Sequence, residues 1–237
     1  MRNRRGSTLL ESLLALFFFS LIIQASLEFF GTARRAFFKL DNALSAREGA
    51  QAGLERLRAD LLLAGDGLAR PIALDLLAGI EAAADGASFL SLEKTARLAN
   101  DVRSGDASLT LADADDFSPG KLVCLADRNR GEILTVASVD GAVLRPDSPL
   151  LHDFTAAGTD VLLLRKVAYL LDPKIGLLKR KVNASPAQPL IEDVRSFSFT
   201  HDIASGLASA SLVLRGKPDK TFSLAVFPRN LALARRG

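Results

Sequence analysis

Residues 6–27 have the sequence Gly-Ser-Thr-Leu-Leu-Glu-Ser-Leu-Leu-Ala-Leu-Phe-Phe-Phe-Ser-Leu-Ile-Ile-Gln-Ala-Ser-Leu. From Leu9 to Leu27 the only charged side chain is that of Glu11. At about 1.5 Å of rise per residue, a helix over this stretch is long enough to cross the roughly 30 Å hydrocarbon layer of a membrane. A carboxylate inside such a helix costs about 2.5 kcal/mol or more unless it finds a partner. Glu11 is therefore a candidate functional residue.

Three interpretations of this N-terminus compete. The first is a plain membrane anchor in which Glu11 is close enough to the interface to reach water. The second is a secretory signal peptide that ends near residues 23–25, but the apolar region of such signals rarely contains an acid. The third is a short basic leader, residues 1–6, followed by a membrane-spanning and assembly helix over residues 7–30.

The third interpretation rests on a resemblance. Gly-Ser-Thr-Leu-Leu-Glu at residues 6–11, followed by a long apolar helix, resembles the N-termini of type IV pilins and pseudopilins. The resemblance implies that a prepilin peptidase cuts between Gly6 and Ser7 and that Ser7 is then N-methylated, although many family members have phenylalanine in the place of Ser7. It also implies that Glu11 meets the Ser7 amine of a neighbouring subunit during assembly. A buried charge would then favour association and fix the axial register of the subunits.

The charge balance gives no reason to expect nucleic acid as a partner. The chain has 30 Lys and Arg against 27 Asp and Glu, a net charge of +3. Three of the basic residues, Arg2, Arg4 and Arg5, lie in the expected leader, so a chain that starts at Ser7 would be formally neutral. Basic residues before an apolar helix keep that end in the cytoplasm. We therefore expect an inner-membrane protein with a cytoplasmic N-terminus and a periplasmic head.

The rest of the sequence predicts an α+β fold, with a long helix followed by many strands. Apolar residues at three- and four-residue steps continue the helix as an amphipathic segment over 31–65, and Gly65-Asp66-Gly67 marks its end. Gly49 and Gly53 within it indicate either a local bend or close packing with another helix. Residues 72–84 are a short helix or irregular. The β-rich head spans 66–237, with strands expected at 87–92, 107–111, 121–126, 132–139, 160–171, 177–182, 194–201, 208–214 and 221–227.

The head has a resemblance of its own. Residues 114–123 with 131–136, residues 165–172 with 178–183, and residues 188–199 are similar to stretches of the PilW-like minor pilins, in order and spacing. This resemblance implies a type IV pilin-like fold and a low-copy subunit that helps to initiate pilus assembly with other minor pilins and the major pilin. Residues 188–199 are also similar to the J-type pseudopilins of type II secretion systems, which are the alternative from the same superfamily.

Catalytic and metal-binding patterns are sparse. His152 and His201 are the only histidines, and neither lies at ligand spacing from another candidate. Three carboxylates, Asp113, Asp115 and Asp116, are a weak calcium candidate, but the same residues suit a turn before Phe-Ser-Pro-Gly. Cys124 is the only cysteine and is expected to be buried and inert.

We therefore expect a minor pilin that moves from the inner membrane into a pilus, without enzymatic activity and without a cofactor. An alternative from a different class is a membrane-anchored periplasmic binding domain that never polymerises. An anchored enzyme is a further alternative, but no catalytic pattern supports it.

Overall fold

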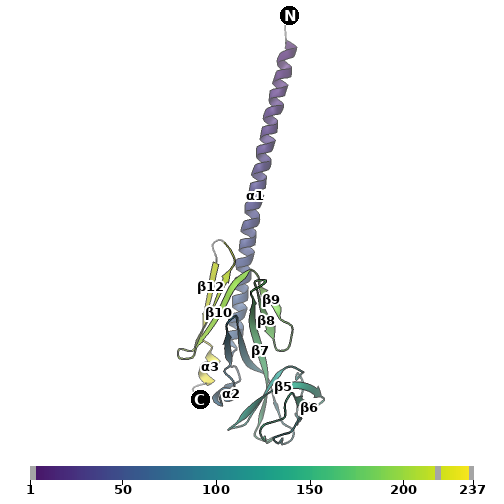
Figure 1. The fold of residues 1–237 in the computed structure, drawn as a ribbon, viewed down its shortest axis with the longest axis vertical. Coiled ribbons are helices and arrows are strands. Elements are labelled where there is room, and N and C mark those ends of the chain that lie inside the picture. Colours follow the sequence, from purple (N-terminus) through teal and green to yellow (C-terminus); the bar gives the residue numbers. More distant parts are fainter. Residues whose placement is uncertain (1–3, 217–219, 235–237) are drawn as a thin grey trace. The chain divides into compact units, whose positions relative to one another are not determined.

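A computed structural model of the protein describes residues 4–216 and 220–234. The described elements are three helices and twelve strands, in the order α1 (Arg4–Leu62), α2 (Ala69–Ala73), β1 (Ile80–Ala83), β2 (Gly86–Arg97), β3 (Leu109–Thr110), β4 (Leu122–Ala126), β5 (Gly131–Asp140), β6 (Val143–Pro146), β7 (Asp160–Asp172), β8 (Leu177–Val182), β9 (Gln188–Ile191), β10 (Val194–Asp202), β11 (Leu207–Leu214), β12 (Lys220–Val226) and α3 (Arg229–Ala234). Figure 1 labels most of these elements along the chain. The expected α+β layout, one long N-terminal helix and an antiparallel β-rich head, is confirmed.

The chain divides into two compact units, Met1–Glu48 and Gly49–Gly237, and the boundary falls within α1. Within the second unit, Ala50, Leu54, Leu57 and Leu61 are buried, at the three- and four-residue steps of one helical face. In the first unit, Phe37, Leu40 and Leu44 belong to the expected apolar stripe but are exposed. The stripe therefore becomes part of a core only from Ala50 onward.

The end of α1 follows the expected glycine signal. Gly65 and Gly67 have φ angles of +79° and +68°, which are easily adopted only without a Cβ. The N–H of Gly65 donates to the carbonyl of Leu90 in β2 at 2.8 Å. The turn after α1 is thereby joined to the first long strand of the head.

The larger sheet is built around the antiparallel pair β2 and β7, which run together from Gly86↔Leu170 to Arg97↔Asp160. Its strand order is β1-β2-β7-β4-β5-β6-β3, and β8 and β9 extend it from a different part of β7. The first half of β7 pairs with β4, whereas the second half pairs with β8. One strand therefore supports two extensions of the sheet.

The extension through β4, β5, β6 and β3 has a core of its own, which we call the lobe core. Val123, Leu125, Leu134, Leu144 and Phe154 are at most 3% exposed and belong to one cluster with the ends of β2 and β7. Long middle segments of the head thus fold as a packed β structure rather than as irregular loops.

A second sheet of three strands, in the order β10-β11-β12, completes the head. Phe89 of β2 joins the two sheets, because its ring centroid lies 5.7 Å from that of Tyr169 and 5.5 Å from that of Phe199. These three strands lie where the sequence predicted strands at 194–201, 208–214 and 221–227, and they pair as an antiparallel meander.

The structure differs from the sequence prediction in its short elements. Residues 72–84 contain the end of α2 and the strand β1. The elements β6, β9 and α3 were not predicted from the sequence. Gly53 packs against Ile191 of β9, since an added Cβ would overlap that side chain. The close approach at Gly53 is therefore to a strand and not to another helix.

Candidate functional site

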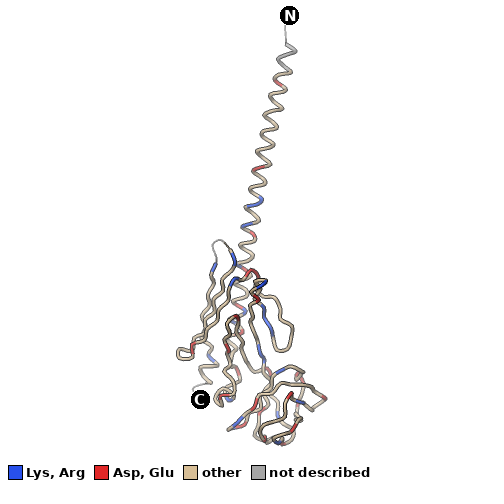
Figure 2. The backbone as a smooth tube through the Cα atoms, in the orientation of Figure 1, with Lys and Arg blue, Asp and Glu red and all other residues tan. Residues whose placement is uncertain are grey.

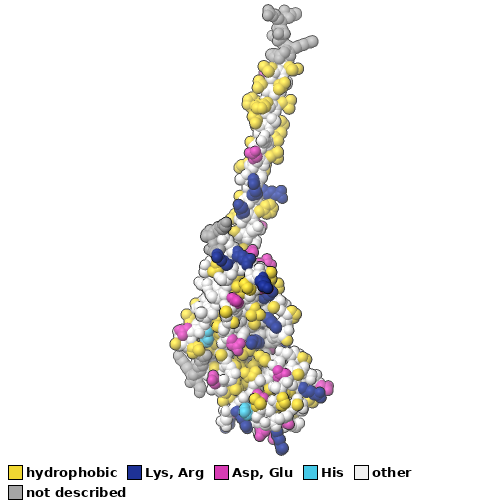
Figure 3. All heavy atoms as spheres, viewed as in Figure 1, with side chains coloured by type: hydrophobic (Ala, Val, Ile, Leu, Met, Phe, Trp, Pro, Cys, Tyr) yellow, Lys and Arg dark blue, Asp and Glu magenta, His cyan; other side chains and the backbone are white. Residues whose placement is uncertain are grey.

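The N-terminal part of α1 presents apolar side chains on all sides. Leu9, Leu13, Phe18, Ile22 and Leu27 are each at least 58% exposed, and other leucine and phenylalanine side chains between them are also exposed. Figure 3 shows hydrophobic side chains along this part of the helix. It is the one described helix that is long and apolar enough to cross a membrane.

Glu11 lies on this apolar surface as an exposed residue of α1. Gly6 and Ser7 lie in the same helix, in its first turns. A carboxylate in apolar surroundings is costly unless an opposite charge or a hydrogen-bond donor meets it. The arrangement therefore suits a contact between this helix and a group from outside it.

A second carboxylate of α1, that of Asp60, lies in the opposite environment. Its side chain is 5% exposed and accepts a hydrogen bond from the Tyr169 hydroxyl at 2.6 Å. The Arg180 guanidinium donates to both oxygens, from Nε at 2.7 Å and from Nη2 at 3.0 Å. Because Tyr169 and Arg180 are directly opposite each other on β7 and β8, both side chains reach the helix from one face of the sheet.

This cluster of Asp60, Tyr169 and Arg180, which we call the helix clamp, shifts the pKa of its members. Burial would raise the pKa of Asp60, but the hydrogen bonds from Arg180 and Tyr169 hold it below its ordinary value. Burial and the Asp60 carboxylate raise the pKa of Tyr169. The bidentate contact to Asp60 raises the pKa of Arg180. All three groups are held in their ordinary charge states, so the clamp fixes α1 to the sheet and has no proton to transfer near neutral pH.

The helix clamp was not predicted from the sequence. Its members are separated by 109 and 120 positions along the chain. The available signals were weak: Asp60 interrupts the apolar side of α1 between Leu57 and Leu61, and Tyr169 is the only tyrosine.

The acidic run Asp113, Asp115 and Asp116 is held by lysine side chains. Lys94 Nζ lies 2.9 Å from Asp113 Oδ2, 3.5 Å from Asp116 Oδ2 and 3.0 Å from the Asp115 carbonyl oxygen. Lys121 Nζ lies 2.7 Å from the Asp116 carbonyl oxygen. Among residues 4–216 and 220–234, no group of three or more potential metal ligands comes together. The ammonium of Lys94 thus takes the place that a cation would have in this turn.

The two histidines and the cysteine lie in separate parts of the described head. His152 packs edge-on to the Phe154 ring, with centroids 6.4 Å apart, far along the chain from His201 at the end of β10. Cys124 is buried in β4, and burial raises the pKa of its thiol to about 12. A thiol with so high a pKa is a poor nucleophile.

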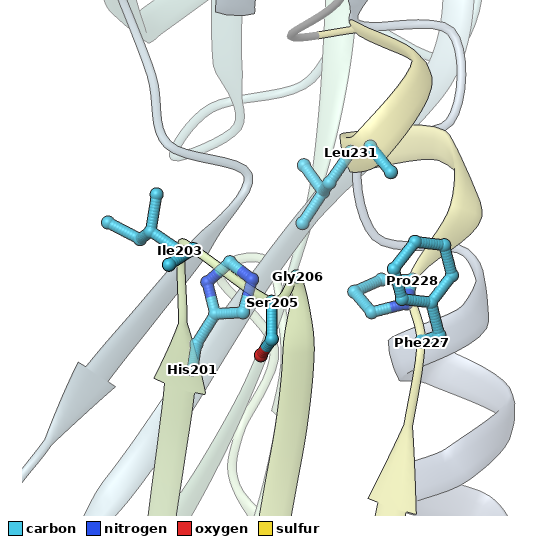
Figure 4. Close-up of a pocket in the computed structure, with 9 residues that line it drawn as sticks. His201, Ile203, Ser205, Gly206, Phe227, Pro228 and Leu231 are labelled. Carbon is cyan, nitrogen blue, oxygen red and sulfur yellow. The ribbon is translucent and has the colours of Figure 1, made fainter.

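His201 lines a hollow of about 200 Å³ at the end of the small sheet. Figure 4 shows its imidazole beside Ser205, across from Phe227 and Pro228. Ser205 is engaged locally, because its hydroxyl donates to Asp202 Oδ2 at 2.6 Å. The hollow combines the imidazole and the Ser205 hydroxyl with apolar side chains such as that of Leu231.

Comparisons with known proteins identify no family for this chain. No family model matches the sequence, and no curated protein matches it. Solved structures with a partial likeness include the Gp54 tailspike of Acinetobacter baumannii bacteriophage AP22 in complex with A. baumannii capsular saccharide, at 21% identity and a TM-score of 0.29. The Pseudomonas phage phi297 tailspike gp61 (26%, 0.28) and the Pseudomonas phage LKA1 tailspike gp49 (16%, 0.28) are similar to the same extent.

These likenesses are confined to a part of each molecule. They cover 32%, 31% and 31% of this chain and 15%, 14% and 15% of the three tailspike chains. At such coverage and TM-scores they carry no argument about the fold or the function of this protein.

Proposed function

We propose that this chain is a minor pilin of the PilW-like type. It is made with a leader that a prepilin peptidase removes between Gly6 and Ser7, and Ser7 is then N-methylated. The helix holds it in the inner membrane, with the head in the periplasm, and later joins it to other minor pilins and to the major pilin. The observation that supports this most directly is Glu11, one acid on the exposed apolar first part of α1, five positions after Gly6.

The architecture of the head supports a low-copy position. The lobe built from β3, β4, β5 and β6 has its own buried core and adds bulk beyond the sheet that packs on α1. A subunit that repeats along a filament must satisfy neighbours on all sides, whereas one at the tip or in the initiating complex has fewer neighbours. We therefore assign this chain to the start of assembly. The J-type pseudopilin of a type II secretion system is the alternative that residues 188–199 favour.

The experiment tests both the removal of the leader and the entry of the chain into filaments. Intact-mass analysis of the membrane-bound protein should give a chain that starts at Ser7, and Gly6→Leu should retain the leader. Glu11→Ala should insert into the membrane as well as the wild type does, because it removes a charge from an apolar helix, but its amount in sheared filaments should fall at least about tenfold. Glu11→Asp is the matched control, since it keeps the charge at the same position.

Three outcomes would contradict the proposal. A mature start at Met1 or near Ser26 would exclude the prepilin leader. Glu11→Ala at the wild-type level in filaments would favour the plain anchor. If purified filaments contained this chain in amounts comparable to those of the major subunit, it could not be a minor pilin.

A further inference from the structure

The strand β12 forms one end of the small sheet and has an open edge. It pairs with β11 from Ala208↔Val226 to Leu214↔Lys220, and no described strand pairs with its other side. Figure 1 shows β12 at the outside of this sheet. An open edge presents backbone N–H and C=O groups that can pair with a strand from another chain. The small sheet can therefore accept one further strand.

The other strands that end the two sheets are protected against such pairing. β3 has two residues, β1 has four, and β9 has four residues that include Pro189, which lacks an N–H. β10 has a bulge between Val194 and Ser196, and it lies against β1 and β2.

By contrast, β12 has seven residues in unbroken register with β11 and contains no proline. After Lys220 the strand has no charged residue, and Figure 2 shows no acidic or basic colouring along this stretch. Among the described strands that end a sheet, β12 is thus the one without the usual protection of an edge. Such an edge favours aggregation when it is left open, so it is expected where a strand from a partner covers it.

A groove of about 440 Å³ separates β12 from α1. The residues that line it are Gln51, Leu54 and Glu55 of α1 and Phe222, Ser223 and Leu224 of β12. No described residue of β11 lines the groove, which therefore lies at the outer edge of the sheet. Phe222 and Leu224 are only half-buried there. A strand added to β12 would lie in this groove and cover both side chains.

We propose that β12 is a docking site for an extended segment of another protein, which adds an antiparallel strand to the small sheet and rests on α1. The segment has about seven residues, to match the length of β12. Apolar residues occupy the alternate positions that face Leu54, Phe222 and Leu224, because successive side chains of a strand point to opposite faces. Small or hydroxyl residues occupy the positions between them and continue the exposed outer face of Thr221 and Ser223.

The groove also favours a basic residue in the partner segment. Among the described residues that line it, Glu55 is the one with a charge, and its side chain is 70% exposed. Arg58 Nη1 lies 3.8 Å from Glu55 Oε2, which is too long for a hydrogen bond. Lys220 begins β12 and does not line the groove. The Glu55 carboxylate is therefore open to a lysine or arginine of the partner.

A second copy of this chain is a poor donor of that strand. Its other end strands are short, contain proline or are covered. Antiparallel pairing of β12 with β12 would point residues 49–62 of the two α1 helices in opposite directions, whereas two chains anchored through the same helix enter the membrane in the same direction. The donor is therefore a different protein. This inference goes beyond the proposed function, because entry into a filament through α1 requires no strand on the head.

The test uses the full-length protein in detergent micelles and a fluorescent synthetic peptide with the sequence of residues 207–214, Leu-Ala-Ser-Ala-Ser-Leu-Val-Leu. This sequence is a suitable probe because β11 already pairs with β12 and alternates buried with part-exposed residues. Fluorescence anisotropy should show saturable binding with a dissociation constant below about 1 mM. No saturable binding up to that concentration would overturn the proposal.

Methylation of the peptide backbone distinguishes strand pairing from other kinds of binding. In an antiparallel pair, every second residue directs its N–H toward the partner strand. Two further peptides are therefore made, one N-methylated at the even-numbered residues and one at the odd-numbered residues. One should bind at least about tenfold more weakly than the other, because only one set of methyl groups replaces the hydrogen-bond donors that meet β12. Equal affinities of the two methylated peptides would refute strand addition.

Disulfide trapping locates the bound peptide. Gln51→Cys places a thiol in the groove, and Arg56→Cys, about 140° around α1, is the matched exposed control. Of three peptides with cysteine at residue 208, 210 or 212, at least one should form a disulfide with the first variant and none with the second, because the Cα atoms must come within roughly 4.4–6.8 Å. Cys124 stays in place because it is buried. Equal trapping by both variants would refute the groove as the site.

The contact with Glu55 is tested by neutralising it. The tightest of three peptides with lysine at residue 208, 210 or 212 should bind Glu55→Gln about threefold more weakly than the wild type, as expected for one exposed ion pair. The uncharged peptide should bind both proteins alike. The same loss for both peptides would refute the pairing of Glu55 with a basic residue.

Two further outcomes identify the occupant and separate this inference from the proposed function. A disulfide-linked homodimer of Gln51→Cys in membranes that excludes the peptide would make a second copy the occupant and overturn the proposal. A chain that binds the peptide but never enters filaments would keep the docking site and remove the minor pilin. A chain that enters filaments without binding the peptide would do the reverse.

Discussion

Two carboxylates on α1, those of Glu11 and Asp60, have opposite surroundings. Glu11 is exposed among leucine and phenylalanine side chains, whereas Asp60 is buried and accepts hydrogen bonds from Tyr169 and Arg180. In both places a charge in apolar surroundings is costly without a partner. The chain supplies the partners of Asp60 from its own sheet. The two ends of α1 therefore differ in burial: its end is fixed within the head, whereas its start leaves a carboxylate and apolar side chains exposed.

The strongest test of this comparison is Asp60→Ala. The substitution leaves the part-buried Arg180 guanidinium, whose side chain is 13% exposed, without its counter-charge and the buried Tyr169 hydroxyl without its acceptor, which should cost about 2–4 kcal/mol. Urea unfolding of the full-length protein in detergent, followed by the fluorescence of the single tyrosine, should show this loss in the free energy of unfolding. Glu11→Ala, on the same helix, should leave the midpoint unchanged.

Asp60→Ala with Arg180→Met is the informative double variant. It removes both charges and should recover a large part of the stability, because an apolar replacement of both partners is far less costly than one unpaired charge. If the single and double variants unfold alike, the helix clamp does not stabilise the head through this pair.

Two glycines on the head-bound part of α1 provide a matched pair. An added Cβ at Gly53 would overlap Ile191 of β9, so Gly53→Ala should destabilise the head by about 1–3 kcal/mol. At Gly49 an added Cβ meets nothing within 4 Å, and Gly49→Ala should raise stability by up to about 1 kcal/mol through helix propensity. Equal effects of the two substitutions on the urea midpoint would contradict the close approach of α1 to β9.

Lowering the pH should also remove the stability that the helix clamp contributes. The pKa of Asp60 in the folded state is below its ordinary value of 3.8, so the unfolded chain binds the proton more readily. The stability from this group is therefore fully present above about pH 5 and is lost as the pH falls below 4. Other carboxylates with lowered pKa values, such as Asp172, act in the same direction. The difference between wild type and Asp60→Asn isolates the clamp, and this difference should shrink on acidification; a difference that stays constant with pH would contradict the assignment.

The sequence predicted the parts of this fold that have local signals. The helix end at Gly65-Asp66-Gly67 and the meander β10-β11-β12 follow from glycine chemistry and alternation within a few residues. The four-residue strands β1, β6 and β9 were missed because their sequences are short, and two of them include a proline, Pro146 or Pro189. The helix clamp could not be predicted, because its members meet only after more than a hundred intervening residues have folded.

The N-terminal site differs in this respect. Gly6, Ser7 and Glu11 lie within six consecutive residues, so a sequence pattern alone can identify them. Their predicted roles depend on a peptidase and on neighbouring subunits, which no fold of a single chain contains. The structure therefore added most for Asp60, because the partners of its charge lie in the same chain.

The smallest effect is expected at the acidic turn of the head. If Lys94 is the counter-ion of Asp113 and Asp116, added calcium has to displace an ammonium that already lies 2.9 Å from Asp113 Oδ2. Calcium also requires six to eight oxygen ligands, and no cluster of metal ligands forms among the described residues. Millimolar calcium should thus shift the urea midpoint no more than the same concentration of magnesium does. Lys94→Ala is the informative variant, because it removes the ammonium from Asp113 and Asp116 and leaves every potential calcium ligand in place. A calcium-specific rise in the midpoint of the wild type would show that the turn is a metal site after all, whereas a rise confined to Lys94→Ala would show that the lysine is what excludes the ion.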